Sequence, residues 1–327
     1  MLYIHGTGHF HPENELSNAF LEGLDIGTNA QWILERVGIQ NRRTVLPLDY
    51  IRHTRNKDLR AAQEAALYTN AETGRRAAEM AMARAGVKPE QIGMVICGGC
   101  TPDTCIPAEA SRVACALGLE VPAFDLHTAC SSFGTQLHFL NQLGAAAPEF
   151  VLVVSPENMT RAVDYSDRNT AVLFGDGTSA AVVSTRVPAR VCVTRTSFGG
   201  SPKGADEVRV PRTGYFWQNG PAVHKFAIKK MASLLEELQQ GLTPEAAERL
   251  VYIGHQANLP MLESVARRCN IPAERHFMNI VGYGNQCAAG APIVLSQHWE
   301  TLKEGDVLGL IVVGSGLAWS SLQIEVR

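Results

Sequence analysis

Hydrophobic runs alternate with segments of helical periodicity along most of the chain. Apolar runs that end near glycines predict strands at residues 1–5, 91–97, 150–155, 178–183, 251–254, 277–280, 307–313 and 319–326. Segments with apolar positions at helical spacing predict helices at 17–24, 29–37, 58–85 with a break near residue 69, 107–117, 136–143, 223–239, 260–269 and 288–298. Strands that alternate with helices favour an α/β fold with layered elements.

A polar, loop-rich stretch at residues 185–222 interrupts this alternation. The segments before and after it share one pattern, in which hydrophobic strands end in glycines. We therefore expect two halves, residues 1–185 and 186–327, joined near this stretch.

Composition limits the classes of function. Hydrophobic residues make up 46% of the chain, charged residues 19%, and the formal net charge is −3, so no basic excess points to nucleic acid or an anionic membrane surface. No apolar run approaches the roughly 20 residues of a membrane span. The first residues lack the features of a signal peptide. We therefore expect a cytoplasmic protein whose eight cysteines are free thiols.

Two cysteines, Cys97 and Cys100, have the spacing of a metal or redox motif. A zinc site would need a second cysteine or histidine pair at similar spacing, and none is present. The motif also follows a predicted strand, whereas a redox pair begins a helix. We expect neither a metal site nor a redox pair at these two cysteines, and we interpret Cys287 as a packing residue.

The strongest chemical candidate is Cys130, which lies between a short extended run at 121–126 and the helix predicted from residue 136. A thiol at a helix N-terminus faces unpaired backbone N–H groups and the positive end of the helix dipole, which lower its pKa. Small neighbours leave room for a substrate. The alternative is a buried and inert cysteine.

His255 and Asn285 also follow predicted strands or turns, where reactive side chains are often presented. A cysteine nucleophile can attack a thioester and carry its acyl group. An imidazole and a carboxamide can donate hydrogen bonds to the enolate that forms when a malonyl group loses carbon dioxide. Taken singly, a structural histidine and a turn asparagine are the simpler interpretations.

Four segments together resemble β-ketoacyl-acyl-carrier-protein synthase III of the thiolase superfamily: residues 125–133 (DLHTACSSF), 255–258 (HQAN), 284–285 (GN) and 314–319 (GSGLAW). Residues 4–8 and 174–177 also fit. The resemblance implies a thiolase-like five-layer αβαβα fold built from two similar halves, and a homodimer. It implies that Cys130 is the nucleophile, that His255 and Asn285 act in decarboxylation, and that the amides of Cys130 and Ser315 form an oxyanion hole.

The resemblance also implies substrate contacts. Its substrates are acyl-coenzyme A and acyl-carrier-protein thioesters, without a further cofactor. By position, the coenzyme A or pantetheine contacts are Trp32, Arg36 and Arg168; the acyl-pocket positions are Ile106 and His224; the carrier-protein contacts are Lys225, Arg267 and Arg268. The alternatives are core packing for the tryptophan and surface ion pairs or a solvated basic face for the cations.

Three positions depart from the family pattern: Pro260 replaces a common arginine, His224 replaces an aromatic residue, and Ile106 replaces a phenylalanine that reaches across the dimer. These departures favour a specialised ketosynthase of secondary metabolism. The leading function is a decarboxylating Claisen condensation with a malonyl- or β-ketoacyl-carrier protein, in fatty acid or polyketide biosynthesis. The alternatives are a ketosynthase that joins two β-ketoacyl chains into a pyrone, resorcinol or cyclohexanedione, an acyltransferase to an alcohol or amine, and an inactive scaffold subunit.

Overall fold

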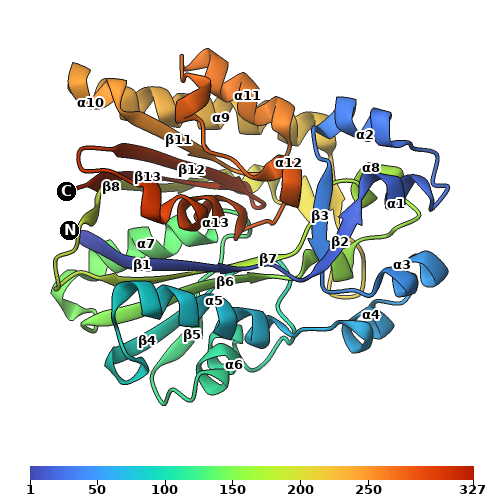
Figure 1. The fold of residues 1–327 in the computed structure, drawn as a ribbon, viewed down its shortest axis with the longest axis horizontal. Coiled ribbons are helices and arrows are strands. Elements are labelled where there is room, and N and C mark those ends of the chain that lie inside the picture. Colours follow the sequence, from blue (N-terminus) through green and yellow to red (C-terminus); the bar gives the residue numbers. More distant parts are fainter.

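The computed structural model describes residues 1–327, and its main feature is a sheet of nine strands (Figure 1). The strand order across the sheet is β11-β12-β13-β8-β1-β7-β6-β4-β5. The bounds are β1 (Leu2–Phe10), β4 (Ile92–Cys97), β5 (Ala123–Asp125), β6 (Phe150–Glu157), β7 (Gly177–Ser184), β8 (Val191–Gly200), β11 (Leu250–Gly254), β12 (Val307–Gly314) and β13 (Ala318–Val326).

The same pairing pattern occurs on both sides of the β1–β8 contact. β1 pairs antiparallel with β7 as β8 does with β13, β7 pairs antiparallel with β6 as β13 does with β12, and β6 pairs in parallel with β4 as β12 does with β11. Only three residue pairs join β1 to β8. The expected boundary at residues 185 and 186 lies between β7 and β8, and the division into halves remains a prediction.

Helices and strands alternate in five layers (Figure 1). The outer helices on one side are α9 (Gly220–Gln240) and α11 (Leu259–Arg268), and those on the other are α5 (Asn70–Ala85) and α6 (Glu109–Ala116). Between the two parts of the sheet lie α7 (Ser132–Leu143) and α13 (Gly290–Gln297). A single buried cluster joins Phe133 of α7 and Val294 of α13 to strands of both parts. The α/β layered fold expected from the sequence is confirmed.

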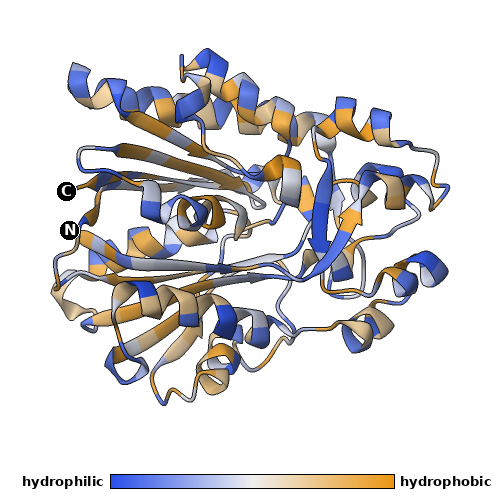
Figure 2. Cartoon of the chain, viewed as in Figure 1, coloured by the Kyte–Doolittle hydropathy of each residue, from blue (hydrophilic) through white to orange (hydrophobic).

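Shorter elements complete the fold, and most of them lie at the end of the layers away from the two termini (Figure 1). They are β2 (Asn14–Ser17), α1 (Asn18–Glu22), α2 (Ala30–Val37), β3 (Asn41–Thr44), α3 (Leu48–Thr54), α4 (Leu59–Ala65), α8 (Arg168–Ala171), β9 (Val208–Arg209), β10 (Trp217–Gln218), α10 (Pro244–Glu248) and α12 (Ile280–Tyr283). Figure 2 shows that β11 and β12 are largely hydrophobic, whereas β3 is hydrophilic.

Two of the expected elements differ from the structure. The stretch predicted as a loop-rich join contains β8, which pairs with β13 along its whole length; only its first three residues are buried, so its sequence lacks a long apolar run. The strand predicted at 277–280 is wrong. There the side-chain oxygen of Gln256 accepts hydrogen bonds from the amides of Asn279 and Ile280, which removes them from any strand ladder.

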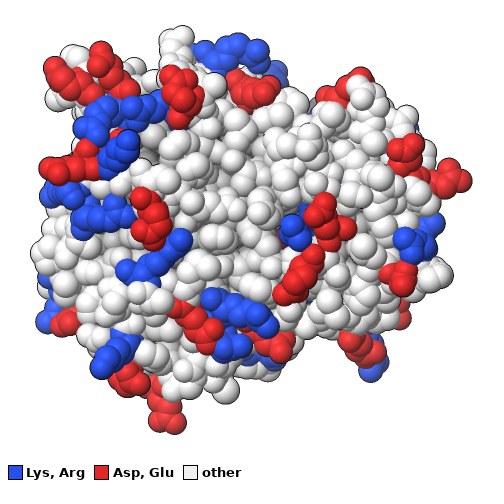
Figure 3. Space-filling view, in the orientation of Figure 1, with Lys and Arg blue, Asp and Glu red and all other residues white.

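The surface in Figure 3 carries acidic and basic side chains interspersed, and no large area on this face has one sign alone. This face lacks the extended basic field of a nucleic-acid-binding surface. None of the helices combines the length and the apolar character required to cross a membrane.

Candidate active site

Cys130 lies in a sharp turn two residues before the start of α7. The preceding residue, Ala129, has a positive φ of 48°, which is unusual for a residue with a Cβ atom. The turn is held by side-chain hydroxyls: Ser131 donates to the Thr128 carbonyl at 2.8 Å and Ser132 to the Ala129 carbonyl at 2.6 Å. The expectation that the thiol lies at a helix N-terminus is confirmed, although the helix begins four residues earlier than predicted.

His255 and Asn285 reach the same region from the other half of the sequence. His255 directly follows β11 and is 6% exposed. Asn285 follows Gly284, whose φ of 68° suits a residue without a side chain. The carboxamide oxygen of Asn285 accepts a hydrogen bond from the Cys287 amide at 2.9 Å. That bond orients the side chain and leaves its NH₂ group as a donor.

These three side chains line one cavity of about 980 Å³, together with Ser315. Ser315 lies between β12 and β13, and its hydroxyl donates to the Val208 carbonyl. A Cβ atom at the preceding Gly314 would lie 2.7 Å from the Thr128 carbonyl oxygen and 3.0 Å from the Cys130 amide nitrogen. Glycine at 314 therefore lets the turn of Ser315 approach the turn of Cys130.

Two further cysteines, Cys100 and Cys287, lie beside Cys130, and the three sulfur atoms are all within 4.8 Å of one another. The Sγ atoms of Cys100 and Cys130 are 3.8 Å apart. The sequence analysis, which interpreted Cys287 as a packing residue and expected no metal or redox role for Cys100, missed this approach. Cys100 lies just beyond β4 and Cys287 just beyond Asn285, so the available signal was two thiols at the ends of elements that the fold brings together.

Charge is unevenly distributed over these thiols. Hydrogen bonds from Cys100 and Cys287, aided by His255, hold the pKa of Cys130 well below its ordinary value despite burial. The bond to Cys130, together with burial, raises the pKa of Cys100 well above its ordinary value. For Cys287, the contact with Cys100 lowers the pKa, but the contact with Cys130 and burial outweigh it. The directions of these shifts make Cys130 the most acidic of the three thiols, with the other two as donors to its sulfur.

The Glu157 carboxyl group lies behind the thiols. It is fully buried and accepts hydrogen bonds from the amides of Cys100 and Ala288 at 2.9 and 3.0 Å. Burial, followed by the negative charge of Cys130, raises the pKa of Glu157 to about 8. A neutral carboxyl group at pH 7 avoids placing a second negative charge beside the thiolate.

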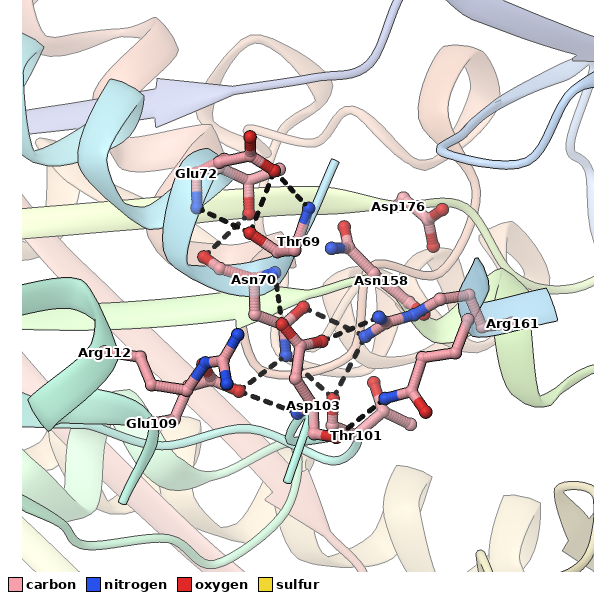
Figure 4. Close-up of polar contacts among 12 residues, drawn as sticks. Thr69, Asn70, Glu72, Thr101, Asp103, Glu109, Arg112, Asn158, Arg161 and Asp176 are labelled. Atoms are coloured by element: carbon pink, nitrogen blue, oxygen red, sulfur yellow. Dashed lines mark hydrogen bonds and ion pairs between the residues drawn. The ribbon is translucent and has the colours of Figure 1, made fainter. Parts of the chain in front are cut away.

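A buried ion pair fixes the loop that carries Cys100 (Figure 4). Arg161 donates to the Asp103 carboxylate at 2.6 Å, and both side chains are almost fully buried. Asn70 donates its side-chain amide to the Thr101 carbonyl at 2.8 Å, and the Asp103 amide donates to Glu109 at 2.8 Å. Residues 101–103 are thus held to α5 and α6, which fixes the position of Cys100.

The expected coenzyme A residues lie near the outer part of the cavity. Trp32 and Arg36, both on α2, line it. Arg168 does not line the cavity, but its guanidinium lies over the Trp32 ring at 5.1 Å and donates to the Gly27 carbonyl at 2.7 Å. The tryptophan is half-buried and packs against the core cluster that contains Ile33 and Val37.

The remaining expected positions are more scattered. His224, on α9, is exposed and lines the cavity, and its neighbour Lys225 is exposed. Arg267 and Arg268, at the end of α11, are exposed, and Arg268 forms an ion pair with Glu236 at 3.0 Å. Ile106 is 85% exposed and does not line the cavity of its own chain.

The five-layer fold and a cavity with a cysteine thiolate, a histidine and an asparagine define a class of enzyme, the acyl-transferring enzymes of thiolase type. Comparison with protein families narrows the class. The family model for 3-oxoacyl-[acyl-carrier-protein (ACP)] synthase III matches residues 124–199, and the model for the C-terminal part of the same family matches residues 239–326.

Relatives of known name agree with this match. A β-ketoacyl-[acyl-carrier-protein] synthase III from Roseiflexus sp. (strain RS-1) is 35% identical, over 98% of this chain and 97% of the relative. The crystal structure of the 3-oxoacyl-[acyl-carrier-protein] synthase III from Aquifex aeolicus VF5 superposes with a TM-score of 0.87 and 30% identity, over 99% of this chain and 100% of that one. The priming β-ketosynthase of the R1128 polyketide pathway has a TM-score of 0.85 at 25% identity, over 100% and 96%.

The chain belongs to the β-ketoacyl-acyl-carrier-protein synthase III family, which confirms the resemblance seen in its sequence. It is an enzyme, an acyltransferase of the ketosynthase type that forms carbon–carbon bonds.

Proposed function

We propose that this enzyme catalyses a decarboxylating Claisen condensation between an acyl group on Cys130 and a malonyl-carrier protein. The convergence of Cys130, His255 and Asn285 on one cavity supports this proposal most directly. His255 and Asn285 lie 125 or more positions after Cys130 in the sequence, so the fold brings the three side chains together.

In the first step, the Cys130 thiolate attacks the carbonyl carbon of an acyl thioester. The tetrahedral oxyanion is stabilised by the backbone amides of Cys130 and Ser315. Collapse expels the donor thiol, coenzyme A or a carrier protein, which takes a proton, and leaves the acyl group on Cys130. The lowered pKa of Cys130 supports this role, because the thiolate is the nucleophile.

In the second step, the malonyl thioester binds with its carbonyl oxygen between His255 and Asn285. Loss of carbon dioxide leaves an enolate, whose oxygen accepts hydrogen bonds from both side chains. The enolate carbon attacks the Cys130 thioester, and the Cys130 thiolate departs as the product β-ketoacyl thioester forms. An amide at position 285 suits this step because, unlike a carboxylate, it donates a hydrogen bond; the same feature disfavours acyl transfer to an alcohol or amine.

The outer cavity and the surface around it supply contacts for both thioesters. Trp32, Arg36 and Arg168 bind the coenzyme A nucleotide or the pantetheine arm, with the indole as a stacking surface and the cations facing phosphate. Lys225, Arg267 and Arg268 contact the acidic carrier protein. Ile106 and His224 shape the acyl pocket, with Ile106 acting in the partner subunit of a homodimer. The reaction takes place in the cytoplasm and needs no cofactor besides its thioester substrates.

The chain is structurally similar both to a 3-oxoacyl-[acyl-carrier-protein] synthase III, with a TM-score of 0.87, and to a polyketide priming ketosynthase, with a TM-score of 0.85, so the acyl groups that the pocket accepts have to decide between the two pathways. A panel of acyl-coenzyme A and acyl-carrier-protein donors, read by intact-protein mass spectrometry, would define the chain length and branching that the pocket accepts.

Acylation of Cys130 tests the nucleophile. The wild-type enzyme gains one acyl mass when incubated with its donor, and digestion places the acyl group on Cys130. Cys130→Ala gains none. Equal labelling of the variant, or labelling at another residue, would contradict the assignment.

Asn285→Ala tests the second step separately. We expect it to become acylated like the wild type yet to release carbon dioxide from malonyl-carrier protein on the order of 10²-fold more slowly, the usual effect of removing one oxyanion donor. Radiometric release of carbon dioxide measures this. Decarboxylation at the wild-type rate would remove Asn285 from the mechanism.

A further inference from the structure

The three thiols of Cys100, Cys130 and Cys287 have a geometry that the condensation does not require. Their sulfur atoms come from three separate segments: the loop after β4, the turn before α7, and the turn after Asn285. The proposed mechanism uses only Cys130 covalently. All three sulfur atoms lie within 4.8 Å of one another, with 3.8 Å between those of Cys100 and Cys130.

These distances match the sulfur spacing around a tetrahedral metal ion. With metal–sulfur bonds of about 2.3 Å, two sulfurs of a tetrahedral zinc site are about 3.8 Å apart. Soft thiolate ligands select thiophilic ions such as Zn²⁺ and Cu⁺ over the hard cations. This cluster is distinct from the Cys97–Cys100 spacing seen in the sequence, since Cys97 is not part of it.

We propose that Cys100, Cys130 and Cys287 bind one thiophilic metal ion of the Zn²⁺ type, with a fourth coordination position open toward the substrate cavity. The ion enters through the cavity that all three thiols line. This site is a binding function of the thiols themselves and does not depend on the condensation reaction proposed above.

Each ligand is held in place by its backbone. The Cys100 amide donates to the Glu157 carboxyl at 2.9 Å, and the ion pair of Arg161 and Asp103 fixes the residues that follow it (Figure 4). The Cys287 amide donates to the Asn285 carboxamide at 2.9 Å. Little reorganisation is needed to bring the three sulfurs around an ion, which favours binding.

Metal binding and acylation exclude each other. On binding, the ion displaces the protons that the cysteines carry to the solvent and is coordinated by three thiolates. An acyl group on Cys130 converts its sulfur to a thioester, which is a poor ligand. A bound ion therefore blocks acylation, and an acylated enzyme loses one of its three ligands.

Co²⁺ replaces Zn²⁺ in tetrahedral thiolate sites and is visible in the absorption spectrum, so the experiment titrates the metal-free protein with Co²⁺ under anaerobic conditions. We expect one ion per chain, with thiolate-to-cobalt charge-transfer bands in the near ultraviolet and visible bands of a tetrahedral ion. Zn²⁺ then displaces the cobalt and removes the bands.

The matched variants are Cys100→Ser and Cys287→Ser, against Cys105→Ser and Cys115→Ser, which alter exposed thiols outside the cluster. Each of the first pair is expected to weaken Co²⁺ binding at least about tenfold and to reduce the charge-transfer intensity, whereas the second pair binds as the wild type does. Circular dichroism and thermal unfolding establish that each variant is folded.

Absence of thiolate charge transfer in the wild type, or spectra unchanged by Cys100→Ser and Cys287→Ser, would overturn the metal site. Prior acylation by the donor thioester should abolish the bands. If no acyl donor loads Cys130, the condensation proposal fails while the cobalt spectrum still decides the metal site.

Discussion

At the level of single residues, the charge on Cys130 depends on the few side chains that donate to its sulfur. Cys100 and Cys287 lower its pKa through hydrogen bonds, and His255 adds a smaller contribution. Burial acts in the opposite direction, because an anion is costly in an apolar cavity. In this enzyme, neutral thiols thus supplement the helix N-terminus that the sequence indicates as the source of thiolate stability.

Replacing Cys100 tests that contribution. Cys100→Ala removes a donor to the thiolate, and a hydrogen bond to a charged group contributes about 1.5–3 kcal/mol, so the pKa of Cys130 should rise. Cys100→Ser retains a donor and should restore most of the lowering. The measurement is the rate of alkylation of Cys130 by iodoacetamide as a function of pH in metal-free protein, with the modified residue identified by mass spectrometry.

The sign of the pH effect is fixed. Because the pKa of Cys130 is lowered, the wild type stays reactive at a pH where the Cys100→Ala thiol is already protonated, and the two rates converge only above the higher pKa. Identical midpoints in the wild type and both variants would show that Cys100 does not stabilise the thiolate.

The residues that carry the proposed chemistry were predictable from the sequence because each lies in a short motif beside a strand or turn. Cys130, His255 and Asn285 were identified in this way, and the structure brings them to one cavity. Cys100 and Cys287 were not, because their proximity to Cys130 depends on how three loops converge after folding. No spacing along the chain encodes that convergence.

At the level of elements, the site depends on two turns that pack closely. The turn between β12 and β13 approaches the turn before α7 so closely that a Cβ atom at Gly314 would be within 3.0 Å of three backbone atoms, those of Thr128, Cys130 and Ser131. Backbone atoms cannot rotate away as the end of a flexible side chain can. Any side chain at position 314 must therefore displace one turn relative to the other.

Gly314→Ala should accordingly move the Cys130 turn away from Ser315. A displacement of about 1 Å in a catalytic group can cost on the order of 10²-fold in rate, so we expect acylation of Cys130 to slow by about that factor. Single-turnover acylation, followed by mass spectrometry, measures it. Gly282→Ala is the control, because a Cβ atom there has no neighbour within 4 Å and the residue has no positive φ. Equal rates for both variants would contradict the close approach.

Elements with a continuous apolar run or a helical repeat were predicted well, and those shaped by their partners were not. β6 and β12, buried along almost their whole length, match the sequence expectation closely. β8 was missed because only its first residues are buried. Its remaining residues form a strand because they pair with β13. The expected strand at 277–280 failed because the Gln256 side chain takes the amide hydrogen bonds that a strand would use.

At the level of the whole molecule, several large apolar side chains of the single chain remain exposed. Phe139 of α7 and Phe198 of β8 are in contact, with ring centroids 5.8 Å apart, yet are 43% and 38% exposed. β5, at the end of the nine-stranded sheet, has one unpaired edge and an exposed Phe124. Exposed edges and apolar patches of this kind are typical of contacts between subunits.

We predict a homodimer whose interface covers these residues, in which case Phe139→Asp combined with Phe198→Asp should shift the protein from dimer to monomer. Burying two unpaired carboxylates in an apolar interface is unfavourable, and we expect the dissociation constant of the dimer to rise at least about a hundredfold. Light scattering coupled to size exclusion, over a range of protein concentrations, measures the mass. Leu34→Asp introduces one carboxylate at an exposed leucine on α2, away from α7 in Figure 1, and should leave the dimer intact. A wild-type protein that is monomeric at all concentrations, or a double variant as dimeric as the wild type, would show that these phenylalanines lie outside any subunit contact.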